Sequence, residues 1–348
     1  MKTFFISTFL LLAFSISSTA QNLITVQNGN KVQFYTSLDS AYVHSSDGDT
    51  LYIPGGSYDV SGLIITKQLF IIGSGHNPDS TAATNISNLS GNLTIAPGAK
   101  GGFLTGFSLC QLYLGDTSIN ASNYTIERCN IGVITFVKNG SSPMASNNLF
   151  TENIIGNVDG GESTNNLFQN NIIGMISNFS SNNTFNHNII LSVYSTTCAG
   201  GASGSPEGNI SGSTIKNNII FGTISTDTKN CTIDNNIFSS IYGSITINLI
   251  NGNVGSNNLI VGSGSLFVKY PVNNHYGFDY SADFHLISTC IGKNAGTGGS
   301  DIGIYGGTFP WKDGSLPYNP HIKANSVFGA TDVNGNLKVN ITVEAQGN

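Results

Sequence analysis

Four residues that could take part in acid–base chemistry occur near one repeated position in this chain. They stand one or two places before an asparagine in copies of a ten-residue motif: Glu152, His187, Lys216 and Asp234. Stacked copies would bring a carboxylate, an imidazole and an amine onto one exposed edge, which suits general acid–base catalysis. A solvated bend is also where a stable repeat protein places charge, and these residue types vary between copies. We therefore assign no catalytic residue and keep the four as candidates.

A second group of chemically capable residues lies within positions 275–286. Imidazole nitrogens and carboxylate oxygens at short spacing can bind a metal ion. The same stretch alternates polar residues with Phe284 and Leu286, however, which is typical of a half-buried edge strand. We expect ordinary solvent-exposed polar residues here; no cofactor is evident, and nothing specifically supports Ca²⁺. The four metal-ligand candidates are His275, Asp279, Asp283 and His285.

Aromatic residues form a third set of candidates. A ring on an outer face or in a loop can serve as a platform for a sugar, because its flat apolar face packs against the sugar's C–H groups. The residues that we expect in such positions are Tyr194, Tyr242, Tyr276 and Trp311.

The overall composition excludes one class of partner. The 348 residues include 13 Lys and Arg against 19 Asp and Glu, for a net charge of −6, and Arg128 is the sole arginine. A surface for nucleic acid needs clustered basic residues, so we expect no nucleic-acid partner.

The first 20 residues have the features of a secretory signal. Lys2 precedes the apolar run FFISTFLLLAF (4–14), and the small residues STA (18–20) suit cleavage near Ala20. The apolar run is too short to span a bilayer, and no later segment reaches that length. We predict a protein that is secreted, periplasmic or held at the cell surface.

The remainder of the chain repeats one motif. The stretch NNLFTENIIG (147–156) is followed by NNLFQNNIIG (165–174) and by more divergent copies. Each copy has an apolar residue, two polar residues, an asparagine and an apolar pair. β-Branched and aromatic residues dominate and helical spacing is missing, which predicts short strands. Aligned copies predict a ladder of Asn153, Asn171, Asn188, Asn218, Asn236 and Asn258.

The repeat interval predicts how the strands are arranged. Its shortest values, 17 and 18 residues, suit a coil of three short strands. Coils would stack as parallel strands about 4.8 Å apart, with Phe and Ile inside. The asparagine side chains would pass hydrogen bonds from coil to coil. In the divergent copy NYTIERCNIG (123–132), either Cys129 or Asn130 could hold the ladder position.

These repeats, with the segments at both ends, resemble the right-handed parallel β-helix proteins of the pectate-lyase-like superfamily. The stretch 34–75 looks like the entry to such a coil, and DFHLISTCIGKNAGTGGSDIGIYGG (283–307) looks like its closing segment. The resemblance implies an all-β, single-stranded right-handed parallel β-helix with an N-terminal capping helix and a short C-terminal hairpin around Asn334-Gly335. The predicted division is a signal peptide (1–20), the β-helix domain with its cap (21–307) and a Pro-containing extension (308–348).

Enzymes of this superfamily that cut acidic polysaccharides would be expected to show one of two residue sets. Lyases use a basic residue, commonly arginine, beside acidic residues that hold calcium, but Arg128 has no acidic motif of that kind next to it. Hydrolases use clustered aspartates, and the chain contains no Asp-Asp pair. Neither set is present.

We therefore expect an exported β-helix protein that binds a carbohydrate or another cell-surface ligand without chemistry. A polysaccharide or cell-surface glycan is the expected partner. The alternatives are a polysaccharide lyase or glycoside hydrolase of the β-helix type, and a structural or adhesive rod. The oligomeric state and the disulfide state of the five cysteines stay open.

Overall fold

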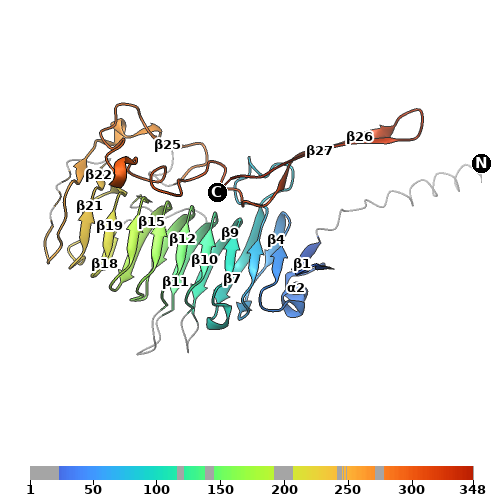
Figure 1. The fold of residues 1–348 in the computed structure, drawn as a ribbon, viewed down its shortest axis with the longest axis horizontal. Coiled ribbons are helices and arrows are strands. Elements are labelled where there is room, and N and C mark those ends of the chain that lie inside the picture. Colours follow the sequence, from blue (N-terminus) through green and yellow to red (C-terminus); the bar gives the residue numbers. More distant parts are fainter. Residues whose placement is uncertain are drawn as a thin grey trace, which may run out of the picture.

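The computed structural model describes residues 23–115, 121–137, 145–191, 207–240, 245, 247, 249–270 and 278–347. The predicted signal segment, Tyr194, Tyr242, His275 and Tyr276 lie outside these residues. The chain is predominantly β, and its short strands build two long parallel sheets that wind into a solenoid (Figure 1). Among the described residues, no helix is long and apolar enough to cross a bilayer.

The first sheet has eleven strands and begins with an antiparallel pair at the N-terminal end. β1 also pairs antiparallel with β3, and from β3 onward each strand pairs in parallel with the equivalent strand of the next coil. The spatial order is β2 (Lys31–Tyr35), β1 (Ile24–Asn28), β3 (Thr50–Tyr52), β6 (Phe70–Ile72), β8 (Phe103–Thr105), β10 (Thr125–Glu127), β12 (Leu149–Thr151), β14 (Leu167–Gln169), β16 (Thr184–Asn186), β19 (Thr214–Lys216) and β21 (Thr232–Asp234).

The second sheet has twelve strands, all of them paired in parallel. Its strands in chain order are β4 (Gly56–Asp59), β5 (Ile64–Ile65), β7 (Ser87–Ile95), β9 (Phe107–Leu114), β11 (Asn130–Phe136), β13 (Ile154–Asp159), β15 (Ile172–Phe179), β17 (Ile189–Ile190), β18 (Glu207–Ile210), β20 (Ile219–Phe221), β22 (Ile237–Ser239) and β23 (Leu259–Ile260).

Equivalent residues of the motif stack in register. Phe150 lies opposite Phe168, which lies opposite Phe185 in the next coil. The first two rings are parallel within 3° with centroids 4.3 Å apart, and the next pair is 5.2 Å apart. All three rings are buried in the solenoid, as the repeat predicts. Offset stacking adds to the area that each ring already removes from water.

The predicted asparagine ladder is confirmed. Each amide Nδ2 donates to the Oδ1 of the next ladder residue at 3.0–3.1 Å, and that Oδ1 also accepts a backbone N–H. In the divergent copy, Cys129 holds the ladder position, because its backbone N–H donates to Asn153 Oδ1 at 3.0 Å. The ladder satisfies polar groups that the coil buries, which removes a desolvation penalty.

A second ladder, which the sequence reasoning missed, stands five positions earlier in each copy. Asn148 donates to Asn166 Oδ1 and Asn166 donates to Asn183 Oδ1, each at 3.1 Å. Ser213 and Cys231 continue this column with an oxygen or sulfur in place of the amide. The signal was present in the sequence as the paired Asn-Asn at the start of three copies, at 147–148, 165–166 and 182–183.

The residue before each ladder position adopts a left-handed backbone. The φ angles are +54° at Glu152, +54° at Asn170 and +57° at His187. The same holds before the second ladder, for example at Asn147 (+59°) and Asn165 (+56°). Asparagine tolerates this conformation better than other non-glycine residues, which accounts for its abundance at both bends.

One part of the predicted interior is wrong. In each Ile-Ile pair only the second residue points into the solenoid, where Ile155 and Ile173 join the main core. The first residue points outward and packs in a separate apolar cluster beneath the C-terminal part of the chain, as Ile154 and Ile172 show. Alternate residues of a strand face opposite sides, so an apolar pair must place one member on the outer face.

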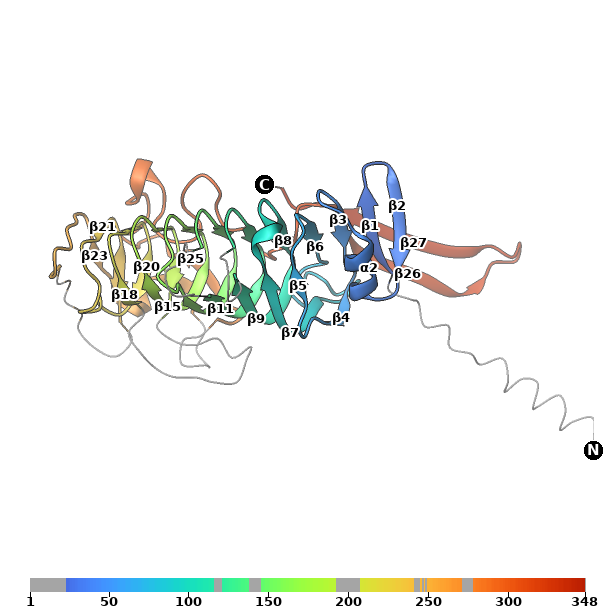
Figure 2. The same ribbon diagram turned by 90° about the horizontal axis from the view of Figure 1, so that it is seen from below.

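The C-terminal part of the chain supplies that cover. After β23 it forms the antiparallel pair β24 (Phe267–Lys269) and β25 (Asp283–Leu286), and it then runs back along the solenoid toward its N-terminal end (Figure 1). We call residues 290–318 the return segment. It leads into the predicted hairpin, β26 (His321–Thr331) and β27 (Leu337–Glu344), which projects past the β1–β2 end (Figure 2).

A helix, α2 (Leu38–His44), lies at the N-terminal end of the solenoid (Figure 1). Ser37 caps its start by accepting a hydrogen bond from Ser40, and Leu38 and Ala41 join the main core. The described residues also contain short 3₁₀ turns at Pro97–Ala99, Ser263–Ser265 and Thr297–Gly299.

The cysteines differ in state. Cys110 is disulfide-bonded, whereas Cys129, Cys231 and Cys290 are buried. Cys198 lies outside the described residues.

Candidate functional site

The predicted exposed edge of acid–base residues is buried instead. Glu152 and His187 are only 3% and 2% exposed, because the return segment lies over them. Lys216 and Asp234 are half-buried and belong to the neighbouring column, where they stand opposite each other in β19 and β21. The structure therefore does not bring the four candidates into one open row.

The column of left-handed residues holds the return segment in place. Asn217 Oδ1 accepts from the Thr297 backbone N–H at 2.9 Å, at the start of the segment. Further along, Asn170 Nδ2 donates to the carbonyls of Ile304 at 2.7 Å and Gly306 at 2.9 Å. The segment thus crosses the coils in reverse order, and one polar side chain of each successive coil contacts its backbone.

His187 belongs to the same column. Its Nδ1 lies 3.2 Å from the Gly303 carbonyl oxygen. Burial lowers the pKa of His187 below its ordinary value, which favours the neutral ring. A neutral imidazole that donates to a backbone carbonyl is a fixed contact and has no open path to a substrate.

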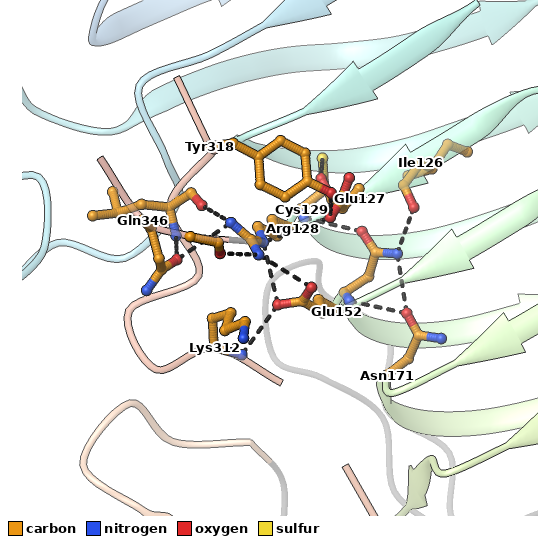
Figure 3. A network of polar contacts seen from close by, with 12 residues as sticks. Ile126, Glu127, Arg128, Cys129, Glu152, Asn171, Lys312, Tyr318 and Gln346 are labelled. Carbon is orange, nitrogen blue, oxygen red and sulfur yellow. Dashed lines mark hydrogen bonds and ion pairs between the residues drawn. The ribbon is translucent and has the colours of Figure 1, made fainter. Parts of the chain in front are cut away.

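The end of the return segment closes over a network around Arg128 (Figure 3). The guanidinium forms a bidentate pair with Glu152, with Nε and Nη2 each 3.2 Å from one carboxylate oxygen. Its Nη1 donates to the Leu316 carbonyl at 2.6 Å, and its carbon lies 4.3 Å from the centre of the Tyr318 ring. Arg128 is fully buried.

Glu127 is the second carboxylate of this network. It lies 3.6 Å from Arg128 Nε and accepts a hydrogen bond from the Tyr318 hydroxyl. Burial raises the pKa of Glu127 to about 7, and it also raises the pKa of Glu152 although Arg128 opposes that shift. Glu127 and Glu152 share one arginine, and Arg128 forms its bidentate pair with Glu152. The positive charge therefore stabilises the ionised form of Glu127 less, and Glu127 holds its proton more tightly.

Paired carboxylates with raised pKa values could serve acid–base chemistry, but both are 3% exposed here. A substrate would have to displace the backbone of Lys312, whose N–H donates to Glu152 at 3.1 Å. These contacts fasten the end of the return segment to the solenoid.

The described metal candidates do not converge. Asp283 Oδ1 lies 2.7 Å from His285 Nδ1, and this histidine stacks on Tyr305 with ring centroids 3.6 Å apart. Asp279 instead accepts the backbone N–H of Ser281 at 2.7 Å. Within the described part of the chain, no three His, Cys, Asp or Glu side chains gather as a metal site would require.

A pocket of about 140 Å³ opens where the return segment and the residues before β25 cross the outer face of the second sheet. Ile154 and Ile172 form part of its lining, and these are the outward-facing residues of β13 and β15. Five phenylalanine, tyrosine and tryptophan rings and a set of polar groups complete it: Phe278, Tyr280, Phe284, Tyr305, Trp311, His76, Asn77, Asp279, Asp313 and Ser315, with Ala282 and Gly314. Trp311 is the one predicted aromatic candidate that the structure describes, and it belongs to this pocket.

The polar groups on one side of the pocket fix the tautomer of His76. The Tyr280 hydroxyl donates to the His76 carbonyl at 2.9 Å and accepts from Asn130 Nδ2 at 2.9 Å. The Tyr280 hydroxyl has one proton, and the His76 carbonyl accepts it. His76 Nδ1, also 2.9 Å from the hydroxyl oxygen, must therefore donate to that oxygen. Burial lowers the pKa of His76 to about 3, so the ring is neutral and its Nε2 is an acceptor.

Two buried polar atoms of the pocket residues have no protein partner: His76 Nε2 and Ser315 Oγ. Both residues are 1% exposed. An unpartnered buried polar atom is costly unless a bound molecule or water satisfies it. Sequence reasoning missed His76 and Tyr280 because they are 204 residues apart and belong to no copy of the motif.

Comparisons with known proteins identify neither a family nor a function for this chain. No family model matches the chain. No curated protein shows significant similarity to it.

Proposed function

We propose that the chain is an exported parallel β-helix protein that binds carbohydrate without transforming it. The observation that carries this proposal is the pocket that contains Trp311, Tyr305 and Phe278 beside two carboxylates. Aromatic rings pack against the C–H face of a sugar ring, while carboxylate and imidazole acceptors take its hydroxyl protons. We further propose the right-handed, pectate-lyase-like form of the fold, with α2 as its cap, and a location outside the cytoplasm.

The tryptophan makes the proposal directly measurable. Trp311 is the only tryptophan of the chain, so its fluorescence reports on this pocket alone. We expect a saturable change in its emission when the mature protein is titrated with neutral, amino and acidic mono- and oligosaccharides. A change with at least one sugar class supports binding; no change with any of them contradicts the proposal.

Phe278 and Phe309 provide a matched pair of variants. Phe278 lines the pocket, whereas Phe309 is 56% exposed and is not part of the lining. We expect Phe278→Ala to weaken binding by roughly three- to tenfold, the loss of one stacked ring. Phe309→Ala should leave the affinity unchanged. Equal effects of the two variants would place the bound sugar elsewhere.

The enzymatic alternative is favoured by one observation, the pair of carboxylates with raised pKa values at Glu127 and Glu152. A lyase would release unsaturated uronates, which absorb in the ultraviolet, and a hydrolase would release reducing ends. We expect neither product. Turnover that Glu152→Gln abolishes would support the enzyme instead, and a lack of both binding and turnover would favour the structural rod.

A further inference from the structure

The pocket near Trp311 offers hydrogen-bond acceptors to a ligand and carries negative charge. Asp279 and Asp313 contribute carboxylates, and His76 contributes the unprotonated Nε2 that the hydrogen bonds of Tyr280 impose. The lining contains no lysine or arginine. A ligand with donors, and especially with a positive charge, fits this set, whereas a uronate or another anion would be repelled.

The carboxylates are held in place by neighbouring groups. Asp313 Oδ1 accepts from the Tyr305 hydroxyl at 2.7 Å, and Asp279 Oδ1 accepts from the Ser281 backbone N–H at 2.7 Å. Each carboxylate keeps further lone pairs for a ligand. Fixed acceptors lose little entropy on binding, which increases their contribution to affinity.

The rings of the pocket suit a cation as well as a sugar face. Trp311, Tyr305 and Phe278 line the same space as the two carboxylates. Tryptophan attracts a cation over its ring face most strongly, and tyrosine and phenylalanine do so less strongly. Aromatic rings combined with carboxylates are a general solution for recognising an ammonium group.

The volume of the pocket is suited to a single ring. About 140 Å³ is close to the roughly 150 Å³ of an apolar cavity that takes up a single benzene molecule. The pocket therefore suits one six-membered ring, such as the end residue of a chain or a free monosaccharide.

From these observations we propose that the pocket binds a single hexosamine ring with a free, protonated amine, which sits against Asp279 and Asp313 while the ring packs on Trp311. This inference rests on the proposed carbohydrate-binding function and names its ligand class. The unpartnered His76 Nε2 accepts a hydroxyl or ammonium proton of the same ring.

Three sugars with one ring shape test the amine directly. Glucosamine, glucose and N-acetylglucosamine differ only at one substituent, and the fluorescence of Trp311 reports binding of each. We expect glucosamine to bind at least tenfold more tightly than the other two, and galacturonate to bind most weakly. Equal or tighter binding of glucose or N-acetylglucosamine overturns the amine inference but leaves carbohydrate binding intact. No binding of any sugar overturns both.

Isosteric variants locate the charge. Asp279→Asn and Asp313→Asn keep an acceptor oxygen and remove the negative charge, so each should weaken glucosamine binding by about tenfold and change glucose binding less than twofold. Asp227→Asn, at an exposed carboxylate outside the pocket lining, is the control and should change neither. An unchanged thermal unfolding curve shows that each variant is folded. Full retention of glucosamine affinity in both pocket variants would overturn the inference.

Discussion

The hydrogen bonds of Asn171 show how a ladder asparagine stabilises the stacked coils. Asn171 is fully buried; its Nδ2 donates to Asn188 Oδ1 and to the Phe150 carbonyl at 3.0 Å, and its Oδ1 accepts from Asn153. Leucine has a similar size and none of these groups. It would leave several buried donors and acceptors unpaired.

We therefore expect Asn171→Leu to lower the free energy of unfolding by about 1–3 kcal/mol. Urea denaturation followed by circular dichroism measures this change. Asn340→Leu, at an exposed position of β27, is the control and should shift stability by less than about 0.5 kcal/mol. An Asn171→Leu protein as stable as the control would argue against a stabilising ladder.

The titration of Glu127 makes the free energy of unfolding depend on pH. Its pKa rises from 4.5 in the unfolded chain to about 7 in the folded one, so the folded state holds the extra proton between these values. The stabilisation from that proton is complete below about pH 4.5 and is lost as the pH rises through 7.

Replacing Glu127 by glutamine removes this titration while an oxygen still accepts from Tyr318. Relative to the unchanged protein, Glu127→Gln should gain up to about 3 kcal/mol of stability between pH 5 and pH 8. Urea denaturation at the two pH values gives the difference. A stability difference that stays constant with pH would mean that Glu127 does not titrate in this range.

At the level of single residues, the repeat predicted the ladder and the phenylalanine stack because equivalent residues of neighbouring coils contact each other. It could not identify His76 or Tyr280, which are 204 residues apart in the sequence and belong to no copy of the motif. It also left Cys129 and Asn130 undecided, since a backbone N–H selects the ladder position and the side-chain type does not.

The return segment shows why the edge predicted to be exposed is buried. The motif places a polar residue at each left-handed bend, and polar residues at bends usually face water. Here the side chains of Asn170 and His187 satisfy backbone groups of another segment instead. The outward isoleucines such as Ile154 were the available signal, because a solvated sheet face would alternate with polar residues.

Close packing of the return segment on the solenoid can be tested at Gly306. A Cβ added there would lie 1.9 Å from the Asp301 carbonyl oxygen and 2.5 Å from His187 Nδ1. Gly306→Ala should therefore lift the segment from the column, at a cost of about 1–3 kcal/mol. The expected results are faster proteolysis within residues 290–318 and a shift of Trp311 emission to longer wavelength.

Gly329→Ala serves as the control for this change, because an added Cβ there meets no atom within 4 Å. It should leave both proteolysis and emission unchanged. Unaltered protease resistance and emission in Gly306→Ala would mean that the segment does not depend on this contact.

In the whole molecule, one chain forms two cores. The main core fills the solenoid, and a second core lies between the outer isoleucines and the C-terminal part of the chain. The repeat predicted the first of these and not the second, because the outward isoleucines of the motif are covered by the C-terminal part of the chain, which contains no copy of the motif. The pocket lies on the border of the second core, where the rings of Trp311 and Phe284 meet the sheet.

An experimental structure of the protein with glucosamine is the most direct test of this account. We predict one sugar ring in the pocket, packed on Trp311, with its amine between Asp279 and Asp313 and a donor within hydrogen-bond distance of His76 Nε2. A glucosamine bound elsewhere on the molecule, or a pocket that stays empty at saturating glucosamine, would contradict it.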